Sequence, residues 1–234
     1  MGKALLVEYY EELPQPKAGG KNREAREALM QSALDKFKER VQERYTEGTL
    51  QRLLDGSTAR ARRASVLALG LVGTMKSNAS VASMLHDEDR VVRQLAADAL
   101  WSLWFRAGTD PNNRELRRLM RQSDPQKAIA GLDALIAKAP HFAEAYNQRA
   151  IFYYRLGDYS RSVADCERVL KLNPYHFGAL SGMGQCYMKL KKSRAALKAF
   201  RSALLINPAL DGIEETIHFL EDALGGEGKK DDKK

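Results

Sequence analysis

Apolar side chains recur at helical spacing along most of the chain. In the segment 143–156 they fall at positions 146, 150, 153 and 154, and in the segment 159–172 at positions 163, 166, 169 and 170. This spacing places them on one face of an α-helix. Gly157 and Asp158 separate the two segments, and Asn173 ends the second because a residue before proline avoids the α region. The pattern predicts two helices joined by a short turn.

This pair of helices is repeated at a fixed distance, a 34-residue period. Pro140, Pro174 and Pro208 follow one another at equal intervals, and Tyr153 aligns with Tyr187 at the same period. A period between about 20 and 50 residues indicates stacked supersecondary units, since one pair of helices cannot bury its apolar face alone. We therefore expect several stacked helix pairs in the C-terminal half.

The repeated unit resembles the tetratricopeptide repeat, whose pattern is W-x2-L-G-x2-Y, then A-x3-F, then P. The first unit follows this pattern at Tyr146, Arg149, Ala150, Tyr153, Ser162, Cys166 and Pro174. The second follows it at Leu180, Met183, Gly184, Tyr187, Ala196, Phe200 and Pro208. A degenerate unit precedes both, with matching offsets at Leu116, Leu119, Ala128, Leu132, Leu135 and Pro140. Arg149 replaces a leucine of the pattern, so we expect it to snorkel or to face a groove.

The N-terminal half shows a second, 31-residue period. The segment 84–103 aligns with 53–73 and resembles the second-helix signature of a HEAT repeat. First helices are expected at about 46–54 and 77–85, and second helices at about 58–72 and 88–106. The resemblance implies a ladder of ion pairs along the stack, which here would join Asp87 or Asp89 to Arg62 and Arg93.

The remaining segments complete the predicted organisation. A helix over about 22–44 is expected to cap the front, with apolar residues at helical spacing at Ala25, Ala28, Leu29, Ala33, Leu34, Phe37 and Val41. We expect an extended arm over 1–21, because Pro14, Pro16 and Gly19–Gly20 would break any helix there. HEAT-like repeats with their cap follow over 22–108, and tetratricopeptide-like repeats over 109–224. A disordered charged tail is expected over 225–234. The last helix, 211–224, should present a polar outer face with Glu214, Glu215, Glu221 and Asp222. The predicted fold is an all-α, right-handed α-solenoid of stacked antiparallel helix pairs, continuous through both halves.

Composition narrows the class of protein. The chain has 234 residues, with 38 Lys and Arg against 30 Asp and Glu, a formal net charge of +8. Its hydrophobic fraction of 44% is enough to build a core. The apolar runs are too short to cross a membrane, and we expect no export signal at the start of the chain. Two cysteines do not make a disulfide framework, which favours a reducing, cytoplasmic compartment.

Residues with catalytic potential do not form a recognisable motif. None of the four histidines has metal-ligand spacing, and His141 and His176 are expected in exposed turns after the repeat prolines. Cys166 and Cys186 occupy packing positions of the repeat. Phosphate-binding glycine loops and nucleophile elbows are absent from the sequence. We expect no enzyme activity, no cofactor and no metal.

The resemblance implies instead a concave binding groove lined by the first helix of each unit. The residues carried onto this groove are Arg114, Arg117, Glu144, Asn147, Gln148, Ile151, Tyr154, Arg155, Ser181, Gln185, Met188 and Lys189. Their aromatic, amide and basic groups suit a peptide or helix with acidic and apolar side chains, so the chain is expected to be a protein-interaction scaffold or adaptor. The alternative is that these residues are merely solvated. Gly178 and Gly182 stand where a clamp for a terminal carboxylate needs side chains, which argues against that clamp.

Two other functions stay open at this point. The chain has clustered basic residues, among them Arg60, Arg62 and Arg63, and a longer run of Lys189, Lys191, Lys192, Arg194, Lys198 and Arg201. A nucleic-acid partner would need such residues in one continuous stripe on a solenoid face, whereas helical spacing argues against a single stripe within the longer run. Exposed helices that carry ion pairs are the favoured alternative. The second alternative is an enzyme accessory like the HEAT-type lyases, which needs an exposed reactive thiol. The sequence leaves the oligomeric state open and predicts no membrane partner.

Overall fold

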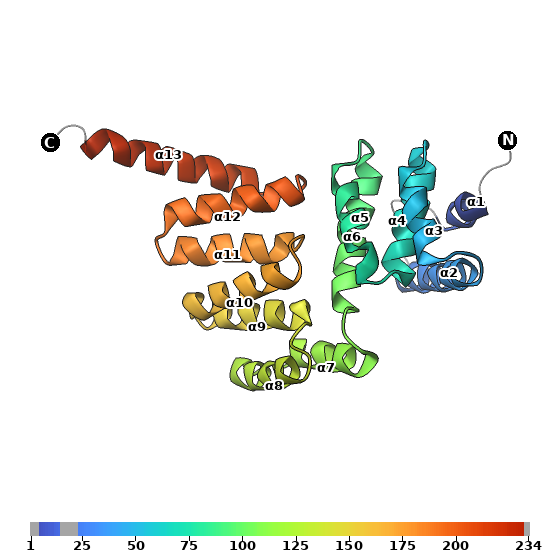
Figure 1. Ribbon diagram of the computed structural model, residues 1–234, viewed down its shortest axis with the longest axis horizontal. Coiled ribbons are helices and arrows are strands. Elements are labelled where there is room, and N and C mark those ends of the chain that lie inside the picture. Colours follow the sequence, from blue (N-terminus) through green and yellow to red (C-terminus); the bar gives the residue numbers. More distant parts are fainter. Residues whose placement is uncertain (1–4, 15–22, 232–234) are drawn as a thin grey trace. The chain divides into compact units, whose positions relative to one another are not determined.

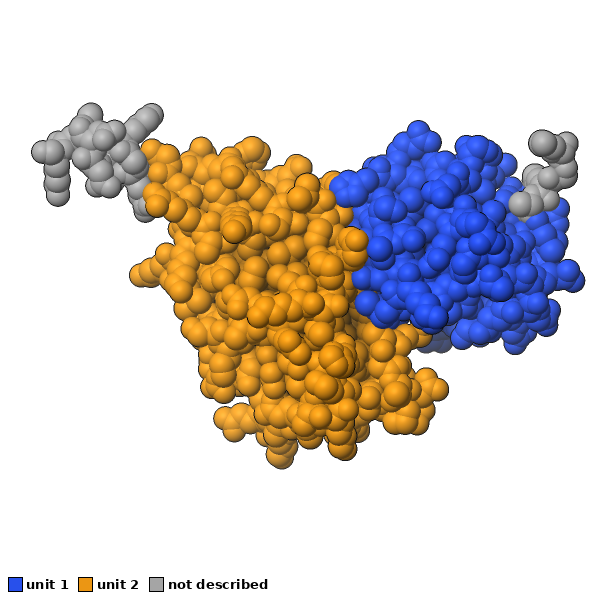
Figure 2. Space-filling view, viewed as in Figure 1, with its two compact units in different colours: residues 1–103 blue, residues 104–234 orange. Residues whose placement is uncertain are grey.

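The computed structural model describes residues 5–14 and 23–231 as backbone, and side chains within that range as far as residue 225. Every regular element in these ranges is a helix, which confirms the predicted all-α class (Figure 1). The chain forms two compact units, residues 1–103 and 104–234 (Figure 2). This division falls near the end of one helix, slightly before the boundary predicted after residue 108. A stack continuous through both units stays a prediction.

The helices of the first unit follow the predicted 31-residue period. They are α1 (Leu5–Glu11), α2 (Arg23–Arg44), α3 (Glu47–Arg52), α4 (Ala59–Val72), α5 (Asn78–Ser83) and α6 (Arg90–Phe105). Short 3-10 turns follow α3 at Leu53–Asp55 and α5 at Met84–His86, in the same register of the period. Both predicted helix pairs are thus present, each with a first helix that is shorter and ends in a 3-10 turn.

The period extends to individual hydrogen bonds. Thr58 accepts a bond from the Ala61 amide at the start of α4, and Asp89 accepts one from the Val92 amide at the start of α6. In the same register, the Arg62 guanidinium donates to the Gly56 carbonyl and the Arg93 guanidinium donates to the Asp87 carbonyl. The two pairs are therefore copies of one structural unit. Their membership of the HEAT family stays a prediction.

The predicted ladder of ion pairs is present in part. Arg62 binds Asp87 through two bonds, Nε to Oδ2 at 2.6 Å and Nη2 to Oδ1 at 2.9 Å. Arg93 does not pair with a carboxylate here and donates to the backbone carbonyls of Asp87 and Glu88. Arg63 adds an ion pair that the resemblance did not imply, with Nε 2.8 Å from Asp89 Oδ1. Hydrogen bonds from Arg63 lower the pKa of Asp89 to about 2.

This lowered pKa makes the stability of the first unit depend on pH in a defined direction. The ordinary Asp pKa is 3.8, so the ionised form of Asp89 stabilises the fold above pH 4, and the contribution is lost as the pH falls towards 2. We expect Asp89→Asn to cost about 1–2 kcal/mol at pH 7, allowing for screening at a side chain that is 19% exposed. Urea unfolding of both proteins at pH 7, 5, 3 and 2, followed by circular dichroism, should show this difference shrinking to near zero at pH 2. An equal difference at pH 7 and pH 2 would contradict the ion pair.

The N-terminal arm is not extended over its described part, so that prediction was wrong. Leu5–Glu11 forms α1, and Leu6, Val7 and Tyr9 are buried. Leu6 and Tyr9 are three positions apart and share a helix face, a signal that the prolines obscured. Pro14 lies beyond the helix and therefore breaks no bond within it. The rest of the arm, 15–21, lies outside the described residues.

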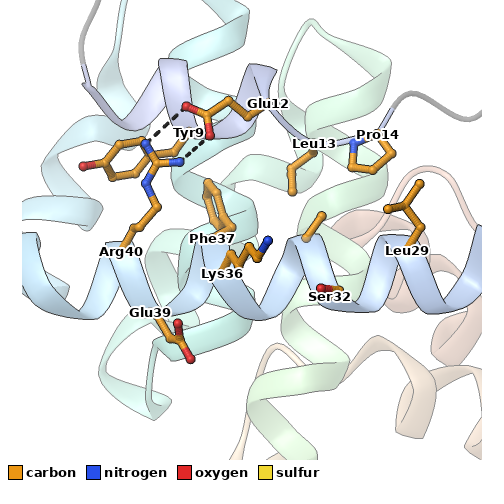
Figure 3. Close-up of a pocket in the computed structure, with 11 residues that line it drawn as sticks. Tyr9, Glu12, Leu13, Pro14, Leu29, Ser32, Lys36, Phe37, Glu39 and Arg40 are labelled. Carbon is orange, nitrogen blue, oxygen red and sulfur yellow. Dashed lines mark hydrogen bonds and ion pairs between the residues drawn. The ribbon is translucent and has the colours of Figure 1, made fainter.

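Helix α2 spans almost the predicted range but buries only part of its apolar face. Phe37 and Val41 are buried, whereas Ala25 and Ala28 are exposed and Leu29 is 60% exposed. A hollow of about 430 Å³ lies between α1 and this helix (Figure 3). On its rim the Arg40 guanidinium covers the Tyr9 ring at 3.5 Å and pairs with Glu12. The helix is thus anchored by its second half.

The second unit consists of consecutive helix pairs followed by a last helix. They are α7 (Asp110–Met120), α8 (Pro125–Lys138), α9 (Ala143–Arg155), α10 (Tyr159–Leu172), α11 (Phe177–Lys189), α12 (Ser193–Ile206) and α13 (Ile213–Asp231). Each helix packs on the next in order (Figure 1). In both full repeats the second helix closes with the same bond at the same repeat position, from Asn173 N to Val169 O and from Asn207 N to Ala203 O.

In the core of this unit, the two full repeats divide side-chain volume differently between the same two packing positions. In the first, Ala150 packs in one cluster with Cys166. In the second, the equivalent residues are Gly184 and Phe200. A Cβ on Gly184 would lie 2.6 Å from Phe200 Cε1, so the larger ring requires the glycine.

Helix α13 extends further than predicted. It was expected to end at residue 224 and to be followed by a disordered tail, but its backbone stays helical to Asp231, so that prediction was wrong over 225–231. Residues 232–234 lie outside the described range. Ile213, Ile217 and Leu220 face the core formed with Phe200. The acids expected on its outer face are exposed at Glu214, Glu215 and Asp222 and half-buried at Glu221. The helix therefore has the polar outer surface of a cap. In the described part of the chain, no helix is both long and apolar enough to cross a membrane.

Candidate functional site

The structure separates the twelve predicted groove residues into an exposed and a buried set. All lie on the first helices α7, α9 and α11, as predicted. The exposed set is Arg114, Arg117, Ile151, Arg155, Gln185, Met188 and Lys189. Tyr154 and Ser181 are half-buried. Glu144, Asn147 and Gln148 are buried, so their assignment to an open groove is not supported by this structure.

The three buried residues form one hydrogen-bonded network. Glu144 Oε1 accepts a bond from Asn147 Nδ2 at 2.9 Å and from Gln148 Nε2 at 2.7 Å. Its other oxygen, Oε2, lies 3.1 Å from His176 Nε2. A buried carboxylate is tolerated only when such partners replace its hydration. These side chains therefore stabilise the fold, because binding a ligand would cost them their present partners.

His176 completes this network and is not the exposed turn residue that we predicted. Its Nδ1 accepts a bond from the Ala179 amide at 3.0 Å and so caps α11. Because Nδ1 is an acceptor, the ring proton lies on Nε2 and is donated to Glu144. Trp104, in the last turn of α6, stacks on the imidazole with ring centroids 4.2 Å apart. The 34-residue period offered a signal for this burial, since it aligns His176 with Phe142, whereas His141 is exposed as expected.

The exposed set contains one large apolar side chain on α9 and one on α11. These side chains, Ile151 and Met188, are 36% and 37% exposed. Tyr154 lies one turn after Ile151 and occupies the same repeat position as Met188. Its ring meets Tyr159 edge-on at 5.4 Å, which holds the side chain in place.

The other members of the exposed set on these first helices are mostly basic. Arg155 and Lys189 occupy equivalent repeat positions at the ends of α9 and α11, and Arg114 and Arg117 lie on α7. The Arg155 guanidinium lies 5.4 Å from the centre of the Phe152 ring. We call the surface made by these residues the first-helix face, and it comprises Arg114, Arg117, Ile151, Tyr154, Arg155, Gln185, Met188 and Lys189.

Sequence reasoning missed one further residue at this register. Phe219 on α13 is 65% exposed and occupies the repeat position of Gln185 and, one repeat earlier, of Ile151. The buried residues of α13 keep the same period, since Ile213 aligns with Ala179 and Leu220 with Cys186. Continuing the repeat register into the closing helix would have found this position.

Arg149 has a structural role that differs from the expected one. Its guanidinium binds Asp165 on α10 through Nε at 2.8 Å and Nη2 at 2.6 Å, and Asp133 on α8 through Nη1 at 2.6 Å. It neither snorkels into solvent nor faces a groove. The ion pairs tie three consecutive helices together at a position where the repeat pattern has leucine.

The two thiols lack the properties of a nucleophile. Both Cys166 and Cys186 are buried, and burial raises the pKa of Cys166 to about 12. The thiolate is the reactive form, so such a group is inert at neutral pH. Cys186 Sγ lies 3.2 Å from Ser162 Oγ, within the core. These facts remove the exposed thiol that the lyase alternative requires. Over the described ranges, no group of three His, Cys, Asp or Glu side chains could hold a metal ion.

Comparison with known proteins agrees with this architecture. Models of the tetratricopeptide repeat match residues 143–176 and 178–210. The C-terminal half therefore contains tetratricopeptide repeats, which belong to a class of helical repeats that bind partners on extended concave surfaces.

Similar proteins share this half of the chain. A TPR repeat-containing protein of Rhizobium etli is 38% identical over 99 residues, covering 42% of this chain and 48% of the relative. Protein SGT1 homolog of Bos taurus is 34% identical over 105 residues, covering 45% and 31%. Hsp70-Hsp90 organizing protein of Triticum aestivum is 23% identical over 127 residues, covering 53% and 22%. The chain thus spans about half or less of the length of these relatives.

Solved structures are similar as well. One of them is the first TPR of Spaghetti (RPAP3) bound to an HSP90 peptide, with 21% sequence identity and a TM-score of 0.46, covering 49% of this chain and 91% of that one.

Proposed function

We propose that the first-helix face binds an extended peptide or helix of another protein, and that the chain acts as a non-catalytic adaptor. The observation that carries this proposal is that Ile151 and Met188 are exposed and Tyr154 is half-buried on first helices that also carry the exposed basic residues Arg155 and Lys189. Apolar groups that stay exposed beside charged ones favour a partner that covers them. Truncating such central contacts is what weakens protein interfaces most.

The charges of this face favour a partner with acidic side chains. Arg114, Arg117, Arg155 and Lys189 are exposed. The acid nearest in sequence to the α7 pair, Glu115, is bound by Arg118 and so is partly neutralised. A positive surface accelerates the association of a negative ligand and selects against a positive one. The partner would therefore carry apolar anchors with Asp or Glu between them.

Two glycines of α11 indicate which part of the partner carries these acids, an internal segment or the C-terminus. Gly178 and Gly182 stand on α11 where a clamp for a C-terminal carboxylate needs side chains. We therefore propose recognition of an internal segment. The adaptor role agrees with the name of one relative, an Hsp70-Hsp90 organizing protein. Two buried unpaired thiols suit a reducing compartment, so the same proposal places the protein in the cytoplasm.

Peptide selection followed by a matched substitution tests the proposal. Random 15-residue peptides would be displayed against the full chain, and the strongest binder labelled with fluorescein for anisotropy. We expect Ile151→Ser with Met188→Ser to weaken its binding about 30-fold, equal to losing about 2 kcal/mol of apolar contact. The control is Leu205→Ser, because Leu205 is 78% exposed but lies on the second helix α12. Equal affinity of the double variant and the wild type would refute the assignment of the site.

A further inference from the structure

The positive charge of this protein is concentrated in one part of the chain. Residues 168–210 contain eight Lys and Arg and no Asp or Glu. Four of these cations, Lys191, Lys192, Arg194 and Lys198, gather at the α11–α12 turn and the first two turns of α12, and all four are exposed. We call them the α12 cationic face.

These four side chains lack the carboxylate partners that other cations of the unit have. On the same helix, Arg201 pairs with Glu221 at 2.6 Å. On α10, Arg161 pairs with Asp158 at 2.5 Å. Among the side chains that the structure describes, no ion pair is formed by any member of the α12 cationic face. Their charge is therefore available to an outside ligand.

The equivalent turn of the preceding repeat has a glycine and a helix cap that this turn lacks. There, Gly157 adopts a φ of 78° and Asp158 caps α10 by accepting a bond from the Arg161 amide. In the next repeat the equivalent residues are Lys191, with a φ of 57°, and Lys192. A lysine is disfavoured in the left-handed region, and α12 has no side-chain cap. The sequence thus carries two lysines where glycine and aspartate would make a more stable turn, and they lie at the positive end of the helix dipole.

We infer that the α12 cationic face binds the phosphate backbone of nucleic acid without sequence preference. Three of the four side chains are lysines, which act as hydrated point charges and need no fixed geometry. Between residues 190 and 200 these four cations are the exposed side chains, so no exposed aromatic or large apolar residue lies among them in the sequence, although protein interfaces rely on such anchors. Without an aromatic member the α12 cationic face also cannot stack bases, so contact is restricted to phosphates. The α12 cationic face shares no residue with the first-helix face, although Lys189 of the latter lies two positions before Lys191.

Salt dependence gives the first test. The full chain would be titrated into a fluorescein-labelled 20-base-pair DNA of random sequence, and into a 20-nucleotide RNA, between 50 and 200 mM NaCl. Four phosphate contacts predict a slope of about −3.6 in log K against log salt for the duplex, a loss of roughly 150-fold over this range. The triple variant Lys191→Gln, Lys192→Gln and Lys198→Gln should reduce the slope to about −0.9 and weaken binding at 50 mM at least 10-fold.

A control variant with the same net charge distinguishes an effect of the α12 cationic face from an effect of the overall charge. Lys127→Gln, Lys138→Gln and Lys171→Gln remove three exposed lysines from α8 and α10 of the same unit. We expect this variant to bind within about twofold of the wild type. Equal losses in both triple variants, or no binding to either nucleic acid by the wild type, would overturn the inference. So would binding of poly-glutamate or of phosphatidylserine vesicles, but not of nucleic acid, that depends on the same three lysines.

A second variant excludes unfolding as the cause of lost binding. Lys191→Gly with Lys192→Asp transplants the turn of the preceding repeat. It should raise the melting temperature by roughly 2–6 °C, because it relieves the left-handed lysine and restores a cap. Nucleic-acid binding should fall at least 10-fold in the same protein. Wild-type affinity in this stabilised variant would contradict the inference directly.

Discussion

Replacing Glu144 with alanine should lower the free energy of unfolding of the second unit by about 3–5 kcal/mol. The substitution removes the acceptor for Asn147 Nδ2, Gln148 Nε2 and His176 Nε2 at once. Each buried donor left without an acceptor costs about 1–3 kcal/mol. The side chains involved are 0–8% exposed, so water replaces the lost bonds only after the surrounding core opens.

Urea unfolding followed by circular dichroism measures this effect, with Glu215→Ala as the matched control. Glu215 is an exposed acid on α13, and its removal should change stability by less than about 0.5 kcal/mol. If Glu144→Ala proved as stable as this control, Glu144 would not be the centre of a buried network. The open groove that the sequence predicted at Glu144 would then return as the better description.

The second large effect is expected at the ion pair between Arg149 and Asp165. Arg149→Met alone should cost about 3 kcal/mol, because it leaves the Asp165 carboxylate, which is 8% exposed, without its counter-charge. The next repeat has Met183 and Ala199 at the equivalent positions. Arg149→Met combined with Asp165→Ala transplants that apolar pair and should return to within about 1 kcal/mol of the wild type.

A double-mutant cycle tests this coupling. The four proteins are the wild type, the two single variants and the double variant, each unfolded in urea at pH 7. A coupling energy of at least about 1.5 kcal/mol in favour of the double variant is expected. Additive losses would mean that the two side chains stabilise the fold through separate contacts. The partner Asp133 is 52% exposed, so losing its bond should add little.

The periods of the sequence predicted most of the helices because each repeat satisfies the same local requirements. The 34-residue spacing fixes the end of each second helix, where the Asn173 and Asn207 amides close the last turn. The resemblance to HEAT repeats likewise implied Arg62 beside Asp87 or Asp89, and the structure pairs it with Asp87. In both cases the residues that decide the structure lie within one unit or its neighbour, so their order in the chain is sufficient.

Predictions from the sequence failed where the burial of a residue depends on contacts that differ from one repeat to the next. His176 looked like a turn residue because it follows a repeat proline, although the 34-residue period aligns it with Phe142. The ring of Trp104 from α6 covers it. Glu144 and its two amide partners looked like groove residues because the groove positions implied by the tetratricopeptide resemblance fall on them, although burial decides their role. The short helix α1 was missed because prolines beyond its end were given more weight than the apolar spacing of Leu6 and Tyr9.

Methyl NMR of the full chain tests the central proposal, that the first-helix face binds a peptide. The chain has seven methionines, and Met188 alone among them belongs to this face. With carbon-13 labelled methionine methyls, assigned by Met188→Leu, the selected 15-residue peptide should shift the Met188 resonance to saturation. The resonance of Met84, a half-buried residue of the first unit, should stay in place. Saturable binding that leaves the Met188 methyl unchanged would contradict the account.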